Sequence, residues 1–514
     1  MTREELLHAS HATLIDLVVA SQERLEEVEQ QLRWFRKQLF GRKSERRILE
    51  PDPSQLCLGE GLAGESEPTA PTTTVRTHVR RKRPAREDPD ESGLRFDDSV
   101  PVRTIEIPNP EIENLPEEAR TEVSEKVTYR LAQRPGSYEV LKLVRKVVKR
   151  ADTGTLSCPP APPAVLEKSY ADVSLLAGML VDKFRYHLPL YRQHQRLQAA
   201  GITVSRASLT SWVSQAIELL EPIYHTQMGA ILTSRVLAMD ETPIRAGRKA
   251  KGKMRTGYFW PVYGDQHEVA FPYAPTRAKR HVEEILGSYC GTLLSDGYDA
   301  YDRYAERRQG VVHALCWVHT RRGFVKAQEV EPVRAQKALD FIGELYETEE
   351  EIRQRGLVGE AKLRLRCEQS RPVVEAFFTW LEEERGTSAL LPTNPFTKAA
   401  LYAAKRRKGL EVFLSDSEVP LDTNHLERAL RVIPMGRKSW LFCWTELGAQ
   451  QVGQIQSLLT TCVLHDVDPY TYLVDVLQRI DRHPYARVSE LRPRIWKEHF
   501  ANAPLRSLLD PSPP

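Results

Sequence analysis

SRVLAMDETPI, residues 234–244, is an apolar run that ends at an acidic residue, Asp240. Two segments after it, GYFWPVYGD at 257–265 and HEVAFPYAP at 267–275, are expected to be further strands. Each contains a proline, which is typical of an edge strand or a bulge. The sequence therefore predicts a three-stranded meander, with Asp240 at the end of its first strand.

Two more strands are expected downstream, after a helix-like stretch around 278–287. GTLLSDGYDAY at 291–301 gives a fourth short strand that ends at Asp296, and GVVHALCWVHTRRGF at 310–324 gives a fifth that ends near Cys316. If the first and fourth strands are neighbours, Asp240 and Asp296 lie at the same edge of the sheet.

A third acid occurs much later, in PLDTNHLERALRVIPMGRKSWLF at 420–442. Leu426, Leu430 and Ile433 are spaced at i, i+4 and i+7, so they are expected to be the buried face of a helix. The opposite, polar face then carries Asn424, Glu427, Arg428 and Arg431. Glu427 is therefore expected to be presented to the site rather than buried.

Carboxylates from two strand ends and one helix form a set of ligands that suits two hard divalent cations. Mg²⁺ prefers oxygen ligands, and two ions about 4 Å apart stabilise the attacking and leaving oxygens of phosphoryl transfer. Other interpretations remain open on spacing alone. A strand-end aspartate is often a solvated turn former, Glu241 or Asp422 could be the true ligand, and Glu427 could pair with Arg431 at i+4.

Composition and charge limit the class of protein. With 514 residues, the chain has room for roughly three domains. The 73 Lys and Arg against 70 Asp and Glu leave a net charge of only +3, which argues against wholesale disorder. No apolar run reaches the roughly 18 residues of a membrane span, and the polar N-terminus does not resemble a secretory signal. The seven cysteines form no CxxC pair. We therefore expect an intracellular protein with reduced thiols and no membrane partner.

The N-terminal part is expected to hold a helix and a linker. Apolar positions from Leu14 to Leu39 step by three and four within 11–47, which predicts a short coiled coil, or else a helix packed on its own chain. Residues 48–86 are expected to be a flexible linker. Its basic end, RTHVRRKRPAR, attracts phosphate or serves as a solubilising tail. The candidate DNA contacts there are Arg80, Arg81, Lys82 and Arg83.

Two small modules are expected next. Alternating strings punctuated by prolines predict a strand-rich module over 87–165. Residues 166–232 are expected to be helical, with a turn at Gly201 and a second helix that Ser205 opens and Arg206 begins. This spacing fits a helix-turn-helix that binds DNA, although helix pairs broken by glycine also occur in proteins that bind none.

Several motifs taken together resemble the large transposase of the insertion sequence 66 family, of the DDE type. They are Asp240-Glu-Thr-Pro, Ser295-Asp-Gly-Tyr, Cys316-Trp-Val-His, Asn424-His-Leu-Glu-Arg-Ala and Gly436-Arg-Lys-Ser-Trp-Leu-Phe. Their order also matches. The likeness extends upstream to LFGRKSER at 39–46 and downstream to DPYTYLVDVLQRI at 468–480, so it covers about residues 14 to 482.

The resemblance implies a multidomain α/β protein with a ribonuclease-H-like catalytic core. The first part of the core is expected at 233–330, a helical insertion at 331–395, the last part with the glutamate helix at 396–465, and a C-terminal helical tail at 466–514. The family's catalytic and metal-binding acids carry over onto Asp240, Asp296 and Glu427. The implied activity is Mg²⁺- or Mn²⁺-dependent cleavage of element ends and strand transfer into target DNA, with two ions.

The resemblance also implies partners and a location. The chain is expected to bind element ends and target DNA, to form a homo-oligomer, and to work with small accessory proteins of the same element. The implied location is the cytoplasm, on the bacterial chromosome. Alternatives from other classes are a catalytically inactive or domesticated DNA-binding protein, and a nuclease that cuts without joining.

Further site residues follow from the same motifs. Cys316 and His319 have a zinc-like spacing, but a core cysteine with a helix-start histidine is the favoured interpretation, because no second ligand pair lies nearby. The resemblance places both beside the catalytic acids, where His319 positions a phosphate or shuttles a proton. Asn424 and Arg428 are expected to support the site. Expected phosphate or base contacts, with a salt-bridged helix end and a buried tryptophan as the alternative, are Arg428, Arg431, Arg437, Lys438 and Trp440.

Two departures from the family pattern stand out. Family members usually carry a cysteine-rich, zinc-finger-like module, whereas residues 84–160 contain only Cys158. No zinc is therefore expected in this region. Thr423 stands where the family commonly has asparagine, directly before Asn424, and the three acids are unaffected.

Overall fold

The computed structural model describes residues 94–509, except 99, 110–119, 135, 152, 153, 168, 251, 252 and 387–390. The helix predicted within 11–47 and the linker predicted for 48–86 lie outside the described residues. The same holds for four candidate DNA contacts, Arg80, Arg81, Lys82 and Arg83.

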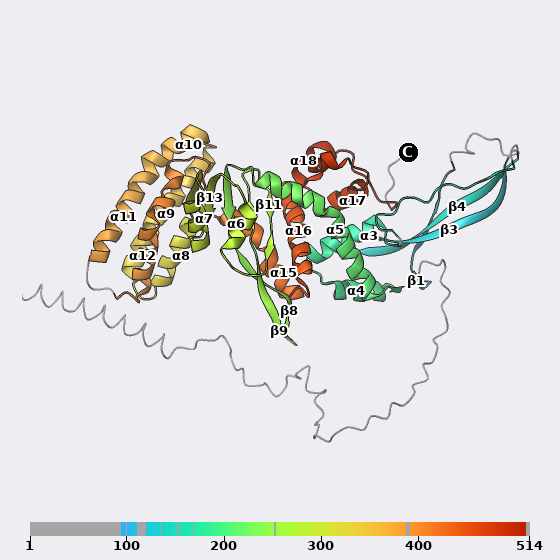
Figure 1. Ribbon diagram of the computed structural model, residues 1–514, viewed down its shortest axis with the longest axis horizontal. Helices are drawn as coiled ribbons and strands as arrows, with labels where there is room; N and C mark the ends of the chain where they lie inside the picture. Colours follow the sequence, from blue (N-terminus) through green and yellow to red (C-terminus); the bar gives the residue numbers. More distant parts are fainter. Residues whose placement is uncertain are drawn as a thin grey trace, which may run out of the picture.

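A five-stranded mixed sheet lies at the centre of the chain (Figure 1). Its strands, in spatial order, are β11 (Val269–Ala270), β10 (Val262–Tyr263), β7 (Val236–Met239), β13 (Gly291–Ser295) and β14 (Val311–Leu315). The strands β7, β13 and β14 are parallel, and β10 and β11 run antiparallel to their neighbours. The predicted meander and the predicted pairing of the first and fourth strands are therefore confirmed.

A second sheet branches from the first. β8 (Thr242–Ala250) and β9 (Lys253–Phe259) form a hairpin, and β12 (Tyr273–Ala274) pairs with β9. The segments 257–265 and 267–275 were each expected to be one strand with an edge or bulge at its proline, but each is divided between the two sheets. Each splits near its proline, Pro261 or Pro272, which lacks the N–H that a continuous ladder needs. The residues before Pro261 pair in the second sheet and those after it in the first, and for Pro272 the order is reversed.

Alternating residues of the central sheet face two different helical layers, as the period of a strand requires. Leu237 and Met239 pack in a cluster with α6 (Arg280–Leu286) and α7 (Asp299–Arg307). Val236 and Ala238 belong to the larger core, which includes α16 (Glu446–Leu464). The parallel strand β7 is thus buried on both faces, which explains its continuous apolar sequence.

The close contact of α16 with the sheet edge leads to a stability prediction at Gly453. A Cβ at Gly453 would lie 2.2 Å from the carbonyl oxygen of Phe271 and 3.2 Å from the Phe259 ring. Because the nearest atom is backbone, we expect Gly453→Ala to lower the free energy of unfolding by about 1–3 kcal/mol. The measurement is the urea midpoint of the full chain.

The matched control is Gly343→Ala, in the middle of α9 (Pro332–Gln354), where nothing lies within 4 Å of an added Cβ. This substitution should be neutral or should stabilise by up to about 1 kcal/mol, because alanine is the better helix former. Equal urea midpoints for the two variants would contradict the packing argument.

The described N-terminal part consists of strands and three helices. β3 (Arg120–Arg134) and β4 (Ser137–Arg150) form a long hairpin that projects from the body (Figure 1), with β2 (Val102–Glu106) and β5 (Leu156–Ser157) beside β4. The helices are α3 (Val173–Phe184), α4 (Leu190–Ala199) and α5 (Arg206–Ile231). β1 (Arg95–Phe96) pairs with β6 (Ile202–Thr203), which lies between α4 and α5.

The predicted start of α5 is confirmed in detail. Gly201 has a φ of +79°, a conformation that favours glycine, and it ends the preceding helical turn. The Ser205 hydroxyl accepts a hydrogen bond from the backbone N–H of Ser208 at 3.0 Å, which is an N-cap. Arg206 is the exposed first residue of α5, with its guanidinium 5.9 Å from the Tyr191 ring.

A stack of helices follows β14 (Figure 1). After α8 (Trp317–Ala327) and α9 come α10 (Gly359–Leu365), the π-helix η3 (Arg366–Ser370), α11 (Arg371–Gly386) and α12 (Pro395–Lys405). Its core is aromatic, with contacts among Trp317, Phe324, Phe377, Trp380 and Phe396.

The chain then returns to the central sheet and continues into a C-terminal group of helices. Between α12 and α16 lie α13 (Arg407–Leu410), η4 (Val412–Leu414), α14 (Asn424–Leu430) and α15 (Val432–Trp440). After α16 come α17 (Pro469–Arg479), η5 (Tyr485–Leu491) and α18 (Pro493–His499). None of the helices in the described part of the chain combines the length and apolarity required to cross a bilayer.

Candidate functional site

Two strand ends bring carboxylates together at one edge of the central sheet. Asp240 directly follows β7 and Asp296 directly follows β13, and these strands are parallel neighbours. One carboxylate oxygen from each of Asp240, Glu241 and Asp296 can be chosen so that all three lie within 4.8 Å of one another. The structure therefore places two of the three acids predicted from the sequence in one cluster, together with Glu241.

The Asp240 carboxyl is in an unfavourable place for a negative charge. Burial, together with the nearby carboxylates of Glu241, Asp296 and Glu427, raises its pKa to about 7, against the effect of a hydrogen bond from the backbone N–H of Glu241 at 2.7 Å. Burial and like charges both disfavour the ionised form. A cation bound among these oxygens would relieve that repulsion.

Glu241 is held by two donors. Its Oε2 accepts a hydrogen bond from the Tyr301 hydroxyl at 2.8 Å, and its Oε1 accepts one from Arg277 Nε at 2.8 Å. Burial raises the pKa of Glu241, while these two donors lower it. Because both oxygens already have partners, Glu241 has less capacity to bind a cation than Asp240 or Asp296.

The turn after β13 fixes Asp296. Its Oδ1 accepts a hydrogen bond from the Tyr298 N–H at 2.9 Å, and its backbone carbonyl accepts one from the Tyr402 hydroxyl of α12. Gly297 has a φ of +84°, and a Cβ there would lie 2.5 Å from Arg406 Nε. The helical stack thus holds this turn in place.

Glu427 reaches the site from α14, on the face predicted to be polar. Its Oε1 lies 3.2 Å from Arg322 Nη2 and 3.7 Å from His319 Nε2, both on α8. The structure therefore pairs Glu427 with α8 rather than with Arg431, the alternative partner suggested by the sequence. Glu427 also contributes to the raised pKa of Asp240, which indicates that the two carboxylates are electrostatic neighbours.

Hydrogen bonds join the start of α14 to α8. The buried Cys316 Sγ accepts hydrogen bonds from the N–H and the hydroxyl of Thr423, both at 3.3 Å. Asp422 accepts hydrogen bonds from Asn424 N and Nδ2, at 2.9 and 2.6 Å, and from the Tyr346 hydroxyl at 2.8 Å. Cys316, Asp422 and Asn424 thereby orient the helix that carries Glu427.

His319 of α8 has the carboxylates of Asp296 and Glu427 as electrostatic neighbours. Burial lowers its pKa, although the carboxylates of Asp296 and Glu427 raise it, so the ring is neutral near pH 7. Its Nδ1 is buried and has no hydrogen-bond partner among the described residues. A neutral imidazole between two acids can accept or donate a proton.

An open cleft of about 740 Å³ leads to these groups. Asp296 and His319 line it, and so do several cations, which makes it suited to a polyanion. The cationic lining residues are Arg277, Arg322, Lys326 and Lys398.

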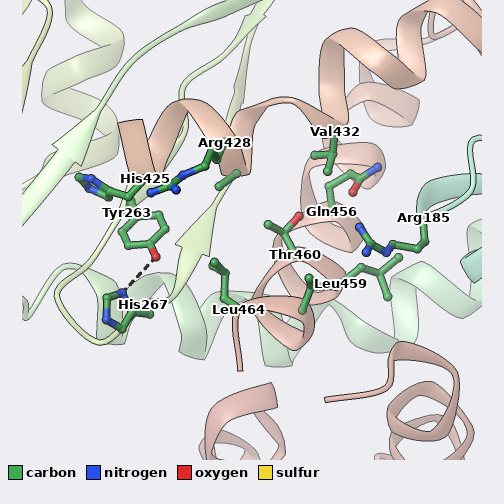
Figure 2. A pocket seen from close by; sticks show the side chains of 12 residues that line it. Arg185, Tyr263, His267, His425, Arg428, Val432, Gln456, Leu459, Thr460 and Leu464 are labelled. Carbon is green, nitrogen blue, oxygen red and sulfur yellow. Dashed lines mark hydrogen bonds between the residues drawn. The ribbon is translucent and has the colours of Figure 1, made fainter. Parts of the chain in front are cut away.

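Arg428 lies beside a different cavity, of about 390 Å³, that shares no lining residue with the cleft. Figure 2 shows His425 and Arg428 extending from α14 toward the Tyr263 ring. The Tyr263 hydroxyl and His267 Nδ1 form a hydrogen bond of 3.1 Å. Burial lowers the pKa of His425 to about 4, so its ring is neutral. The sequence interpretation expected Arg428 to support the carboxylate site, whereas in the structure Arg428 lines this other cavity.

The predicted phosphate and base contacts between Arg431 and Trp440 have mixed environments. Arg431 and Lys438 are exposed, whereas the Arg437 guanidinium donates a hydrogen bond to the Pro243 carbonyl. The Trp440 ring packs on Gly436, and its Nε1 is buried. These contacts agree with the alternative interpretation of a packed tryptophan.

Sequence reasoning missed four residues that position the acids. Tyr301 and Arg322 lay within quoted motifs but were given no role, and the sequence offered no signal for Arg277 or Tyr402. These four side chains touch Glu241, Glu427 or the Asp296 backbone only because the folded chain brings together residues distant in sequence.

Three family models match the chain. One described as Transposase IS66 family matches residues 168–451, more than half of the chain. One described as IS66 C-terminal element matches 457–493, and one described as Transposase C of IS166 homeodomain matches 27–105. The last match falls mostly outside the described residues.

Curated relatives include two uncharacterized proteins of Sinorhizobium fredii (strain NBRC 101917 / NGR234). The protein y4hP is 31% identical over 499 residues, which cover 91% of this chain and 88% of that protein. The protein y4jD is 30% identical over 355 residues, 65% of this chain and 68% of that protein. The family models and these relatives show that the chain belongs to the IS66 family of transposases.

Proposed function

We propose that this protein is a DDE transposase that cuts the ends of its insertion element and joins them to target DNA with the help of divalent metal ions. The observation that carries the proposal is the convergence of Asp240 and Asp296 at two adjacent parallel strand ends, with Glu427 of α14 near enough to contribute to the raised pKa of Asp240. Membership of the transposase family supports DNA as the partner.

The sheet order supports a ribonuclease-H-like core. Along the chain the five strands are β7, β10, β11, β13 and β14. In the sheet they lie in the order third, second, first, fourth, fifth. Relative to the first strand, β7, only the second strand, β10, runs antiparallel. In this proposal, 233–330 and 396–465 form the core and 331–395 is the helical insertion between the fifth strand and the glutamate helix.

The donor set fits hard divalent cations. The clustered ligand atoms are carboxylate oxygens, which Mg²⁺ and Mn²⁺ prefer. The pKa of Asp240 is raised first by burial and then by the neighbouring carboxylates, and a bound cation would offset both effects. Asp240, Asp296 and Glu427 would hold two such ions. When bound, the ions would activate the attacking oxygen and stabilise the leaving oxygen of phosphoryl transfer.

The chain's own residues would position DNA and the acids. Arg277 and Arg322 hold Glu241 and Glu427 in place, as their ion pairs show. Lys326 and Lys398 line the cleft and would bind phosphates of the strand to be cut. His319 would position the scissile phosphate or move a proton, because its neutral ring faces Glu427 at 3.7 Å.

The remaining parts are proposed to bring DNA ends and subunits together. The helix pair α4 and α5, within 166–232, would bind DNA with Arg206, and the 11–47 segment would form a coiled coil that supports a homo-oligomer. The 87–165 module would work without zinc. Small accessory proteins of the same element would assist, in the cytoplasm and on the bacterial chromosome.

The test is cleavage and joining of a labelled duplex that carries the element's ends, with Mg²⁺ or Mn²⁺, in the presence of any accessory proteins. Metal-dependent nicking followed by strand transfer would support the transposase. Nicking without joining would favour a nuclease, and DNA binding without chemistry would favour an inactive DNA-binding relative.

A further inference from the structure

The β8–β9 hairpin leaves the catalytic edge of the sheet two residues after Asp240 and projects from the body (Figure 1). Between Glu241 and Asp265 the sequence contains no acidic residue. Cations are spread along both strands, and those that the structure describes are exposed. They are Arg245, Arg248, Lys249, Lys253 and Arg255.

A second basic segment leaves the other side of the site. Between Glu427 and Glu446 there is again no acidic residue, and the cations are Arg428, Arg431, Arg437 and Lys438. The segment returns to the hairpin, where Cys443 N–H donates to the Arg245 carbonyl at 2.8 Å and Gly247 N–H donates to the Cys443 carbonyl at 3.2 Å. The hairpin, which follows Asp240, and this segment, which follows Glu427, are therefore joined by main-chain hydrogen bonds.

Large apolar side chains are exposed at this junction. The exposed fractions are 64% for Leu441 and 62% for Trp444, and Met435 and Leu447 are also exposed. The Arg248 guanidinium lies 5.2 Å from the Trp444 ring, which also packs edge-on against Phe442 at 5.0 Å. Basic residues interleaved with an exposed aromatic ring are typical of surfaces that bind nucleic acids.

The backbone at Leu441 is strained in a way that exposes its side chain. Leu441 has a φ of 63° and a ψ of −54°, and Phe442 N–H donates to the Trp440 carbonyl at 2.7 Å, which closes the strained form of the γ-turn. Such a backbone conformation is unfavourable for a residue other than glycine. An exposed leucine held in this conformation is typical of a contact surface rather than of a packing position.

From this arrangement we infer that the hairpin and residues 441–447 form a second DNA-binding surface, beside the catalytic cleft; it is called the hairpin surface below. It rests on the proposed function, since its partner is the DNA on which that function acts. Arg245, Arg248, Lys249 and Lys253 contact phosphates, while Trp444 and Leu441 pack against bases or sugars. A second protein copy is the less favourable occupant, because two identical basic surfaces repel each other.

The test uses the full chain and fluorescence anisotropy with labelled duplexes of about 30 base pairs, one of arbitrary sequence and one from the element's end. The triple variant Arg248→Ala/Lys249→Ala/Lys253→Ala should weaken binding by roughly tenfold or more near 0.1 M salt. It should also reduce the slope of log affinity against log salt by up to about three. Trp444→Ala should weaken binding without a change in that slope.

The matched control is Arg353→Ala/Arg355→Ala/Arg364→Ala, which removes the same charge from exposed ion pairs in the helical stack. This control should bind DNA nearly as the parent does. Weaker binding of the hairpin variant to the element's end alone would assign the surface to that end. Weaker binding to both probes would assign it to DNA in general, including target DNA.

Two outcomes would overturn the inference. One is unchanged affinity of the hairpin variants for both probes, with folding verified by circular dichroism. The other is a change of oligomeric state in Trp444→Ala with unchanged DNA affinity, which would make the patch a protein interface. Catalysis is a separate readout. If the parent never cuts DNA but the hairpin variant loses binding, the hairpin surface stands and the proposed chemistry fails.

Discussion

Asp240→Asn and Asp296→Asn are each expected to reduce DNA cleavage on the order of a thousandfold, which corresponds to about 4 kcal/mol of transition-state stabilisation. Asparagine keeps the size of the side chain but removes the negative charge that holds a divalent cation. Initial rates of metal-dependent nicking measure the effect. DNA affinity should remain close to that of the parent, because neither carboxylate attracts phosphate.

The control for this prediction is Glu241→Gln, in the same cluster. Both oxygens of Glu241 already accept hydrogen bonds from Tyr301 and Arg277, and the glutamine oxygen can keep one of them. We therefore expect Glu241→Gln to retain far more activity than either asparagine variant. A larger loss in Glu241→Gln than in Asp296→Asn would instead assign the metal ligand to Glu241. Mn²⁺ titration by calorimetry provides a readout that does not depend on activity.

Arg366→Met is expected to have the largest effect on stability, about 3–5 kcal/mol, because it leaves a partly buried carboxylate unpaired. The Arg366 side chain is fully buried in η3. It donates to both oxygens of Glu349, at 2.7 and 2.9 Å. Its Nη1 also donates to the carbonyls of Phe413, Asp416 and Val419 at 2.9–3.2 Å. One side chain thus holds α9 against the segment that leads to α14.

The measurement is the urea unfolding midpoint of the full chain, followed by circular dichroism. The control is Arg371→Met, five residues further along, where an exposed arginine donates to the Leu414 carbonyl at 3.4 Å. This variant should lose less than about 1 kcal/mol, since an exposed hydrogen bond contributes little. Similar losses in the two variants would show that burial of Arg366 is not the cause.

The sequence was sufficient to predict the parts of the fold that repeat a simple period. Apolar runs ending at Asp240 and Asp296, and a helix with Glu427 on its polar face, could be found because strands and helices show their buried faces in the spacing of residues. The Ser205 cap could be found because its signal is local.

The β8–β9 hairpin could not be found in the same way. The exposed positions of β8 are mainly basic, and among its buried positions Thr242, Ile244 and Ala246 only Ile244 is strongly apolar, so the alternation does not stand out in the sequence. The apolar residues at 257–263 were assigned to one strand instead of two. The partners of the acids were missed for another reason. Arg322 meets Glu427 across 105 residues of chain, and no local pattern encodes such a contact.

The long helical stack between β14 and α14 also sets the time at which the site can form during synthesis. Glu427 follows Asp296 by 131 residues (427 minus 296). A ribosome that adds about 5–20 residues per second therefore produces the second acid roughly 7 to 26 seconds before the third. During that interval the nascent chain holds two of the three proposed acids, and the helix that presents Glu427 does not yet exist. A protein with this order of elements gains its complete set of acids only after most of the chain has been translated.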